Sequence, residues 1–143
     1  MKKIILLLLF PFLGMTQNNS LEGKNGFSNY VFGVSPAEIK DLTLEIEEDN
    51  TKLYSLPEDN IKIKGVEFEY IRVTFFKNKL STISVQTKNQ TGSNFLKILK
   101  ESYGEPNRSN LAKKNYEWLG AKMQVIFEKN RSEKDAYISF YSK

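Results

Sequence analysis

Apolar and polar residues alternate with a period of two in the middle of the chain. The pattern covers residues 61–75 and 80–87, where Lys, Glu, Arg and Thr separate apolar positions, and it predicts two β-strands. Residues 77–79 (KNK) predict the tight turn of a hairpin between them. The apolar set moves from even to odd positions between Tyr70 and Ile71. We therefore expect a β-bulge there, because a regular strand would turn these side chains to the opposite face.

Four shorter segments also have the composition of strands. Pro57 ends the first, and Gly120-Ala121 predicts a turn between the second and third. The four predicted strands are residues 52–56, 115–119, 122–128 and 135–142. Residues 45–50 (EIEEDN) are acidic and turn-prone, and we expect a link there.

Two segments carry helix signals. Residues 36–42 follow Ser35, a capping hydroxyl, with Pro36 at the first helical position and Glu38 placed to reach back to the cap. Residues 94–103 put most of their apolar side chains on one face, and Gly104 predicts the helix end. A helix followed by strands thus occurs twice, which makes an internal α-β-β-β duplication plausible. We expect an α+β domain in which an antiparallel sheet of five to six strands has both helices on one face.

The start of the chain is typical of a secretory signal peptide. Met1-Lys2-Lys3 is followed by the apolar residues 4–13 and by small residues at positions 14 and 16. The apolar run is too short to span a membrane, so we expect cleavage before Gln17 and no stable membrane anchor. Residues 17–26 are polar and predict a flexible leader, and residues 27–143 predict a single domain. The protein is expected to be exported, to the periplasm or outside the cell.

Three motifs resemble those of known exported proteins. Residues 32–40 (FGVSPAEIK) and 99–106 (LKESYGEP), the latter followed by Tyr116-Glu117-Trp118 and an apolar strand, form a pattern of helix, YG-x-P, W and strand. This pattern resembles small exported proteins of the beta-lactamase-inhibitor-protein-like group, which includes outer-membrane assembly lipoproteins, and uncharacterised secreted proteins of Bacteroidota. The resemblance implies an α+β domain that binds protein surfaces and performs no catalysis. The chain departs from the lipoproteins because it has no Cys to acylate.

Composition excludes many kinds of chemistry. The chain has no His and no Cys, so the usual Ser-His and Cys-His nucleophiles, disulfides and the usual zinc, copper or haem sites cannot form. The glycines follow neither dinucleotide-binding nor P-loop spacing. Loss of Lys2 and Lys3 with the signal lowers the net charge of +4 by two, which disfavours nucleic acid as a partner. We expect no catalytic residue, no cofactor and no metal.

Paired carboxylates are the common catalytic device that remains available. The densest acids are Glu45, Glu47, Glu48 and Asp49, which could in principle surround calcium or flank a sugar. The run lacks the alternating oxygens and the glycine of a calcium loop, so a solvated loop is the simpler interpretation. Whether the run binds a cation stays open at this point.

Aromatic residues supply the candidate binding site. Tyr137 and Tyr141 share one face of their predicted strand and point away from the core if Ile138 and Phe140 point inward. Tyr116 and Trp118 likewise share a face of theirs, although a tryptophan is often part of the core. Large aromatics at the centre of an interface carry much of its binding energy. We therefore take these four residues as candidates for protein binding.

The expected function is that of an exported, monomeric, non-catalytic module that recognises another protein, as an inhibitor or immunity protein does. The alternative is an accessory protein for envelope assembly or structure. A carboxylate-based hydrolase of glycans is the less favoured third reading.

Overall fold

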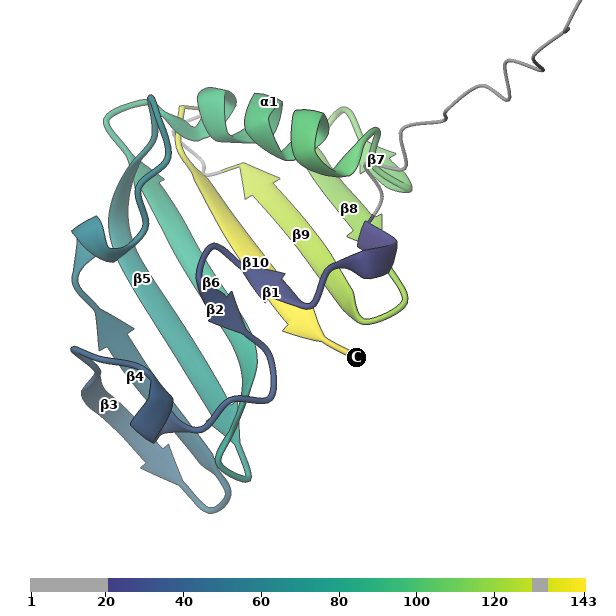
Figure 1. The fold of residues 1–143 in the computed structure, drawn as a ribbon. Helices are drawn as coiled ribbons and strands as arrows, with labels where there is room; N and C mark the ends of the chain where they lie inside the picture. The colour runs from purple at the N-terminus through teal and green to yellow at the C-terminus, as the bar shows by residue number, and fades with distance from the viewer. Residues whose placement is uncertain (1–20, 130–133) are drawn as a thin grey trace, which may run out of the picture.

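The computed structural model describes residues 21–129 and 134–143, and within them the protein is mostly β (Figure 1). The expected signal peptide, residues 1–16, lies outside the described residues. The described chain starts with a short 3-10 helix, Leu21–Gly23, whose Leu21 is buried. An added Cβ at Gly120 would lie only 2.5 Å from the Leu21 side chain, so the turn at Gly120 needs a glycine for this helix to pack.

Eight strands form one sheet in the order β3-β4-β5-β6-β10-β9-β8-β7, and every neighbouring pair is antiparallel. Strand β10, the last in sequence, therefore lies in the interior of the sheet, between β6 and β9. The strands are β3 (Thr43–Glu48), β4 (Thr51–Leu56), β5 (Glu67–Phe76), β6 (Lys79–Lys88), β7 (Arg108–Asn110), β8 (Asn115–Leu119), β9 (Met123–Lys129) and β10 (Ala136–Ser142).

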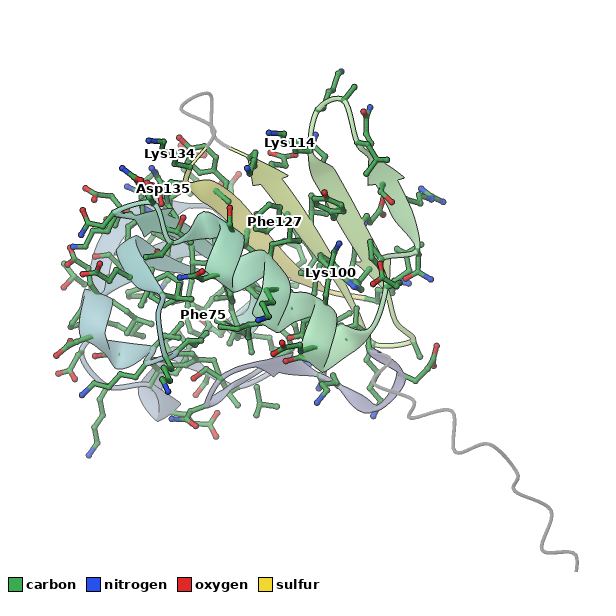
Figure 2. The ribbon with its side chains drawn as sticks, turned by 90° about the horizontal axis from the view of Figure 1, so that it is seen from above. Phe75, Lys100, Lys114, Phe127, Lys134 and Asp135 are labelled. Carbon is green, nitrogen blue, oxygen red and sulfur yellow. The ribbon has the colours of Figure 1, made fainter. Side chains whose placement is uncertain are left out.

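One face of this sheet is covered. Helix α1 (Gly92–Tyr103) lies across it, together with a two-stranded sheet of β1 (Gly26–Phe27) and β2 (Tyr30–Val31) (Figures 1 and 2). Phe27 stacks on Phe140 of β10 with ring centroids 4.1 Å apart and lies 5.9 Å from Phe95 of α1. Phe95 and Leu99 are at most 1% exposed, so the helix buries its apolar stripe against the sheet.

The structure corrects the expected fold class, because one α-helix is present in the described residues and not two. The Ser35 N–H does donate to Glu38 Oε2 at 2.7 Å, but only a 3-10 turn, Pro36–Glu38, follows before Ile39 becomes extended. The expected acidic link is instead mostly strand β3, and the sheet has eight strands, not five or six. With no helix in the first half, the α-β-β-β duplication is wrong as well.

Local predictions around the central hairpin are confirmed. Lys77 and Asn78, both with positive φ (49° and 61°), connect β5 to β6 in the manner of a type I′ turn. The register shifts between Phe68 and Tyr70, which places the expected bulge at Glu69.

Helix α1 begins two residues earlier than expected and ends at Gly104, whose φ of 78° favours glycine.

Candidate functional site

The candidate site is the face of the sheet opposite α1, which we call the open face. Cross-strand pairing arranges its central side chains in three rows across β5, β6, β10 and β9. These rows are Tyr70-Gln86-Tyr137-Glu128, Arg72-Ser84-Ser139-Ile126 and Thr74-Thr82-Tyr141-Gln124. The residues between them in each strand, such as Val73 and Ile138, are fully buried on the other face. Each strand thus holds the open face in place through its core side chains.

Tyr137 and Tyr141 lie on this face, as the strand parity predicted, and each is 38% exposed. They stand four residues apart on β10, which is about 13 Å along a strand. Ser139 separates them, and Gln86 and Thr82 of β6 flank them. The sequence placed Tyr70 in the inward set, but the bulge at Glu69 turns it to the open face as a third tyrosine.

Burial raises the pKa of Tyr70, while the nearby charge of Arg72 opposes that rise and Tyr137 adds to it. The guanidinium carbon of Arg72 lies 4.3 Å from the centre of the Tyr70 ring, a cation-π contact. The raised pKa keeps the Tyr70 hydroxyl protonated well beyond neutral pH, and in that form it can both donate and accept a hydrogen bond.

Arg72 is the positive charge nearest the centre of the open face. Its Nε lies 3.2 Å from Oε2 of Glu45 and is covered, yet within the described part of the chain it has no hydrogen-bond partner of acceptable geometry. The distance from Arg72 Nε to Glu45 Oε2 is short enough for a hydrogen bond, but the angle at the N–H is not suitable. The contact is therefore a charge pair without a directed hydrogen bond. The Arg72 side chain as a whole remains 41% exposed.

Tyr116 and Trp118 lie on the covered face and do not join Tyr137 and Tyr141. Trp118 is 1% exposed and donates its indole N–H to the carbonyl oxygen of Gly104 at 2.9 Å. This hydrogen bond connects the C-terminal end of α1 to strand β8. The Tyr116 ring is half-buried, with its centroid 5.9 Å from that of Phe127.

The acidic run does not form a carboxylate cluster. Glu45 pairs with Arg72, whereas Glu47 lies 3.4 Å from Lys52 Nζ on the neighbouring strand. Among residues 21–129 and 134–143, no group of three or more acidic residues is placed to hold a metal ion. The structure therefore gives no support to the calcium or glycosidase reading of these acids.

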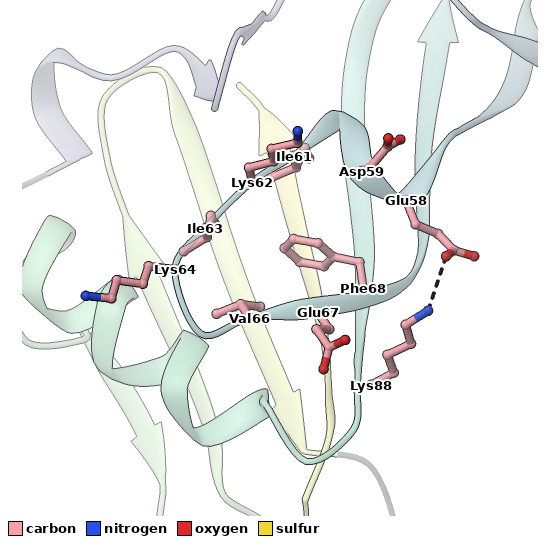
Figure 3. Close-up of a pocket in the computed structure, with 10 residues that line it drawn as sticks. All are labelled: Glu58, Asp59, Ile61, Lys62, Ile63, Lys64, Val66, Glu67, Phe68 and Lys88. Carbon is pink, nitrogen blue, oxygen red and sulfur yellow. Dashed lines mark hydrogen bonds and ion pairs between the residues drawn. The ribbon is translucent and has the colours of Figure 1, made fainter.

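A hollow of about 420 Å³ lies between the loop after β4 and the start of β5 (Figure 3). Its floor is apolar, formed by Ile61, Val66 and Phe68, and its rim includes Glu58 and Lys88, joined at 3.2 Å. The hydrogen bond to Glu58 is the main cause that raises the pKa of Lys88, so this lysine is a cation at neutral pH and a poor nucleophile.

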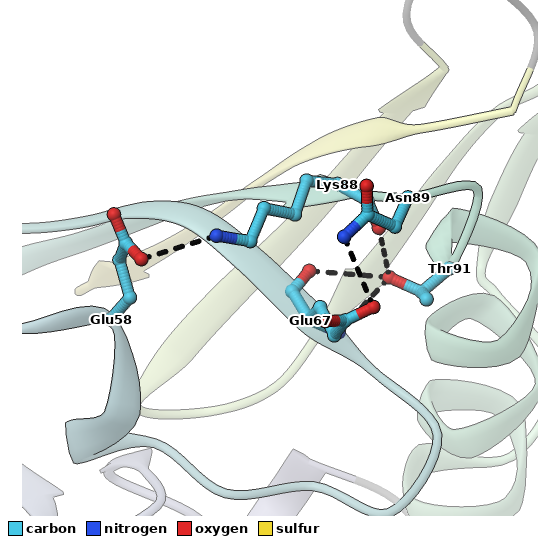
Figure 4. A network of polar contacts seen from close by, with 5 residues as sticks. All are labelled: Glu58, Glu67, Lys88, Asn89 and Thr91. Carbon is cyan, nitrogen blue, oxygen red and sulfur yellow. Dashed lines mark hydrogen bonds and ion pairs between the residues drawn. The ribbon is translucent and has the colours of Figure 1, made fainter.

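The polar groups beside this hollow serve structural roles (Figure 4). Thr91 Oγ1 accepts from the backbone N–H of Glu67 at 3.0 Å and lies within donating distance of two backbone carbonyls. The Asn89 amide donates to the Glu67 carboxylate at 3.2 Å. These contacts join β5, the end of β6 and the start of α1, and they do not leave a convergent pair of reactive groups.

Comparison with known proteins gives no relative. No protein-family description, no curated protein and no solved structure matches the chain significantly. The resemblance to the beta-lactamase-inhibitor-protein-like group therefore stays a prediction. None of the helices in the described segments is long and apolar enough to cross a membrane.

Proposed function

We propose that this protein is an exported, non-catalytic module that binds another protein through the open face, as an inhibitor or immunity protein does. The observation that carries the proposal is the set of three tyrosines, Tyr70, Tyr137 and Tyr141, on a sheet face that no other described element covers (Figure 1). Rigid strands hold these side chains, so little ordering is needed when a partner binds.

The chemistry of the open face suits a protein partner. Tyrosine contributes a large contact area at a low cost in conformational entropy, and Ser, Thr and Gln supply adaptable hydrogen bonds. The rows that contain Ser139 and Tyr141 hold eight residues, and Arg72 is the one charged residue among them. This agrees with the low content of charged residues at the centres of protein interfaces. Within residues 21–129 and 134–143, neither the hollow beside β5 nor the open face offers a pair of reactive groups that would favour catalysis.

Site-specific cross-linking in the exporting cell tests this proposal. A photo-reactive phenylalanine analogue placed at Tyr137 or Tyr141 should capture one partner, whereas the same analogue at the exposed Val31, on the covered side, should not. A toxin or enzyme as the captured partner supports the inhibitor reading, and outer-membrane machinery would support an envelope accessory. Equal capture from Val31 would contradict the open face as the interface.

Binding measurements with the captured partner then give the energetic test. Tyr137→Ala and Tyr141→Ala should each weaken binding by about thirtyfold or more, because truncation of a central interface aromatic costs about 2 kcal/mol or more. Val31→Ala is the matched control, since it also truncates an exposed apolar side chain on a strand.

N-terminal sequencing of the exported protein should find Gln17 first; an intact Met1 on cytoplasmic protein would contradict export.

A further inference from the structure

The sheet has two free edges, β3 at one end and β7 at the other. Within the described residues β3 pairs only with β4, and β7 pairs only with β8. Every residue of both strands is exposed. The outer backbone N–H and C=O groups of these strands are therefore open to pairing with another strand.

The directions of the two edges fit each other. Because the sheet holds eight strands and every neighbouring pair is antiparallel, β3 and β7 run in opposite directions. A second copy in the same orientation, placed beside the first, would bring its β3 against β7 of the first as an antiparallel pair. Such a pair continues the sheet and keeps α1 of both copies on the same face.

The charges of the two edges are opposite. Strand β3 and its turn carry Glu45, Glu47, Glu48 and Asp49; Glu48 and Asp49 form no ion pair with another described residue. Strand β7 and the turn that follows it carry Arg108, Lys113 and Lys114, all exposed. Arg108 lies 3.7 Å from Glu117 and is still 72% exposed. Like charges therefore oppose β3-to-β3 and β7-to-β7 pairing, and opposite charges favour β3 against β7.

Both edges also carry exposed apolar side chains. Leu44 and Ile46 of β3 are 48% and 50% exposed, and Leu111, next to β7, is 74% exposed. Large apolar residues at a free strand edge promote association because water is released when they meet. The acidic edge and the basic edge thus each offer an apolar contact.

We infer that β3 of one copy pairs with β7 of a second copy, head to tail, so that the protein self-associates weakly into an extended sheet. This contact is heterologous and does not close on itself. It differs from the monomer expected from the sequence, and it does not depend on the open face. Strand β7 has three residues, so the pairing is short and association needs high protein concentration.

Sedimentation velocity of the purified protein, without the predicted signal peptide (residues 1–16), is the first test. Between about 10 μM and about 1 mM, the average sedimentation coefficient should rise with concentration and should pass the value of a dimer. Raising NaCl from about 50 mM to about 500 mM should weaken association by about tenfold or more, because salt screens exposed charges. A monomer at every concentration in low salt would overturn the inference.

Charge exchange between the edges is the decisive test. The pair Glu47→Lys and Glu48→Lys sets two lysines against Glu45 and Asp49, so β3 and its turn lose their net negative charge and no longer attract the basic β7 edge. The pair Lys113→Glu and Lys114→Glu makes both edges acidic. Each double variant alone should be monomeric, whereas an equimolar mixture should associate again. Asp59→Lys with Glu69→Lys is the control, because it makes the same charge change at exposed sites outside both edge strands and their turns, and it should associate about as well as the wild type.

Other outcomes would assign the edges differently. Circular dichroism must show that each variant is folded, and a folded mixture that stays monomeric would overturn the inference. Loss of association in Tyr137→Ala, with the charge variants unaffected, would overturn it in favour of the open face. If a basic extended peptide shifts the β3 amide resonances of a protein that remains monomeric, the β3 edge binds a different partner, and the second copy is ruled out.

Discussion

Replacement of Thr87 by valine should destabilise the fold strongly, although the two side chains have nearly the same shape. Thr87 is 1% exposed and is the buried polar side chain of the described core. Its hydroxyl lies 2.9 Å from Asp135 Oδ1, to which it donates, and it accepts the backbone N–H of Ala136 at 2.9 Å. The hydroxyl therefore connects the end of β6 to the start of β10.

The magnitude follows from those two contacts. A hydrogen bond to a charged group contributes about 1.5–3 kcal/mol, and a buried N–H left without an acceptor costs about 1–3 kcal/mol. These contributions overlap, so we expect Thr87→Val to lower the free energy of unfolding by about 2–4 kcal/mol. Thr87→Ser keeps the hydroxyl and loses one buried methyl group, which should cost about 1 kcal/mol.

Urea denaturation followed by circular dichroism measures both variants. With a slope of about 2 kcal/mol per molar urea, the valine midpoint should fall by about 1–2 M and the serine midpoint by less. The reasoning fails if valine is tolerated as well as serine, because the Ala136 N–H would then have found another acceptor. Equal slopes are needed for the comparison, since a change in slope would mean that the unfolded state had changed.

Two further predictions concern the helix and its end. Leu99→Ala should lower the free energy of unfolding by about 2–5 kcal/mol, because Leu99 is 1% exposed on the inner face of α1. Glu48→Ala, on the exposed strand β3, should stay within about 0.5 kcal/mol of the wild type, and similar urea midpoints for the two variants would contradict the burial of Leu99. Burial raises the pKa of Tyr103 to about 12 from an ordinary 10.0, so the unfolded chain loses this proton at lower pH than the folded protein does. The free energy of unfolding should therefore fall by about 2–3 kcal/mol as the pH rises from about 10 to about 12. In Tyr103→Phe that alkaline loss should shrink, and parallel pH profiles of the two proteins would refute the role of Tyr103.

Short-range signals allowed correct predictions where neighbouring residues decide the structure. The Lys77-Asn78 turn, the apolar stripe of α1 and the stop at Gly104 all depend on residues within a few positions of each other. Strand parity likewise placed Tyr137 and Tyr141 on one outward face. Such signals can be interpreted without knowledge of the rest of the chain.

The errors arose where distant pairing decides the structure. The capping signals at Ser35 and Glu38 are real, but a single turn satisfies them, and the chain then extends to bring β3 beside β4. The acidic composition of β3 concealed a strand, because an edge strand needs no buried face. Tyr70 was assigned to the wrong side because the bulge lies one residue earlier than the change in parity suggested.

The interior position of β10 has a consequence for how and where the protein folds. Strands β3 to β6 form one consecutive meander and β7 to β9 another, and residues 136–142 alone join the two through the sheet. Neither meander can complete its apolar face until these residues arrive, so the rate-limiting closure involves contacts of high sequence separation. If the chain is exported as proposed above, β10 is the last of the described strands to emerge, and the eight-stranded sheet can be completed only after it does. The two meanders would then stay unjoined, and the chain able to cross, until translocation is nearly finished.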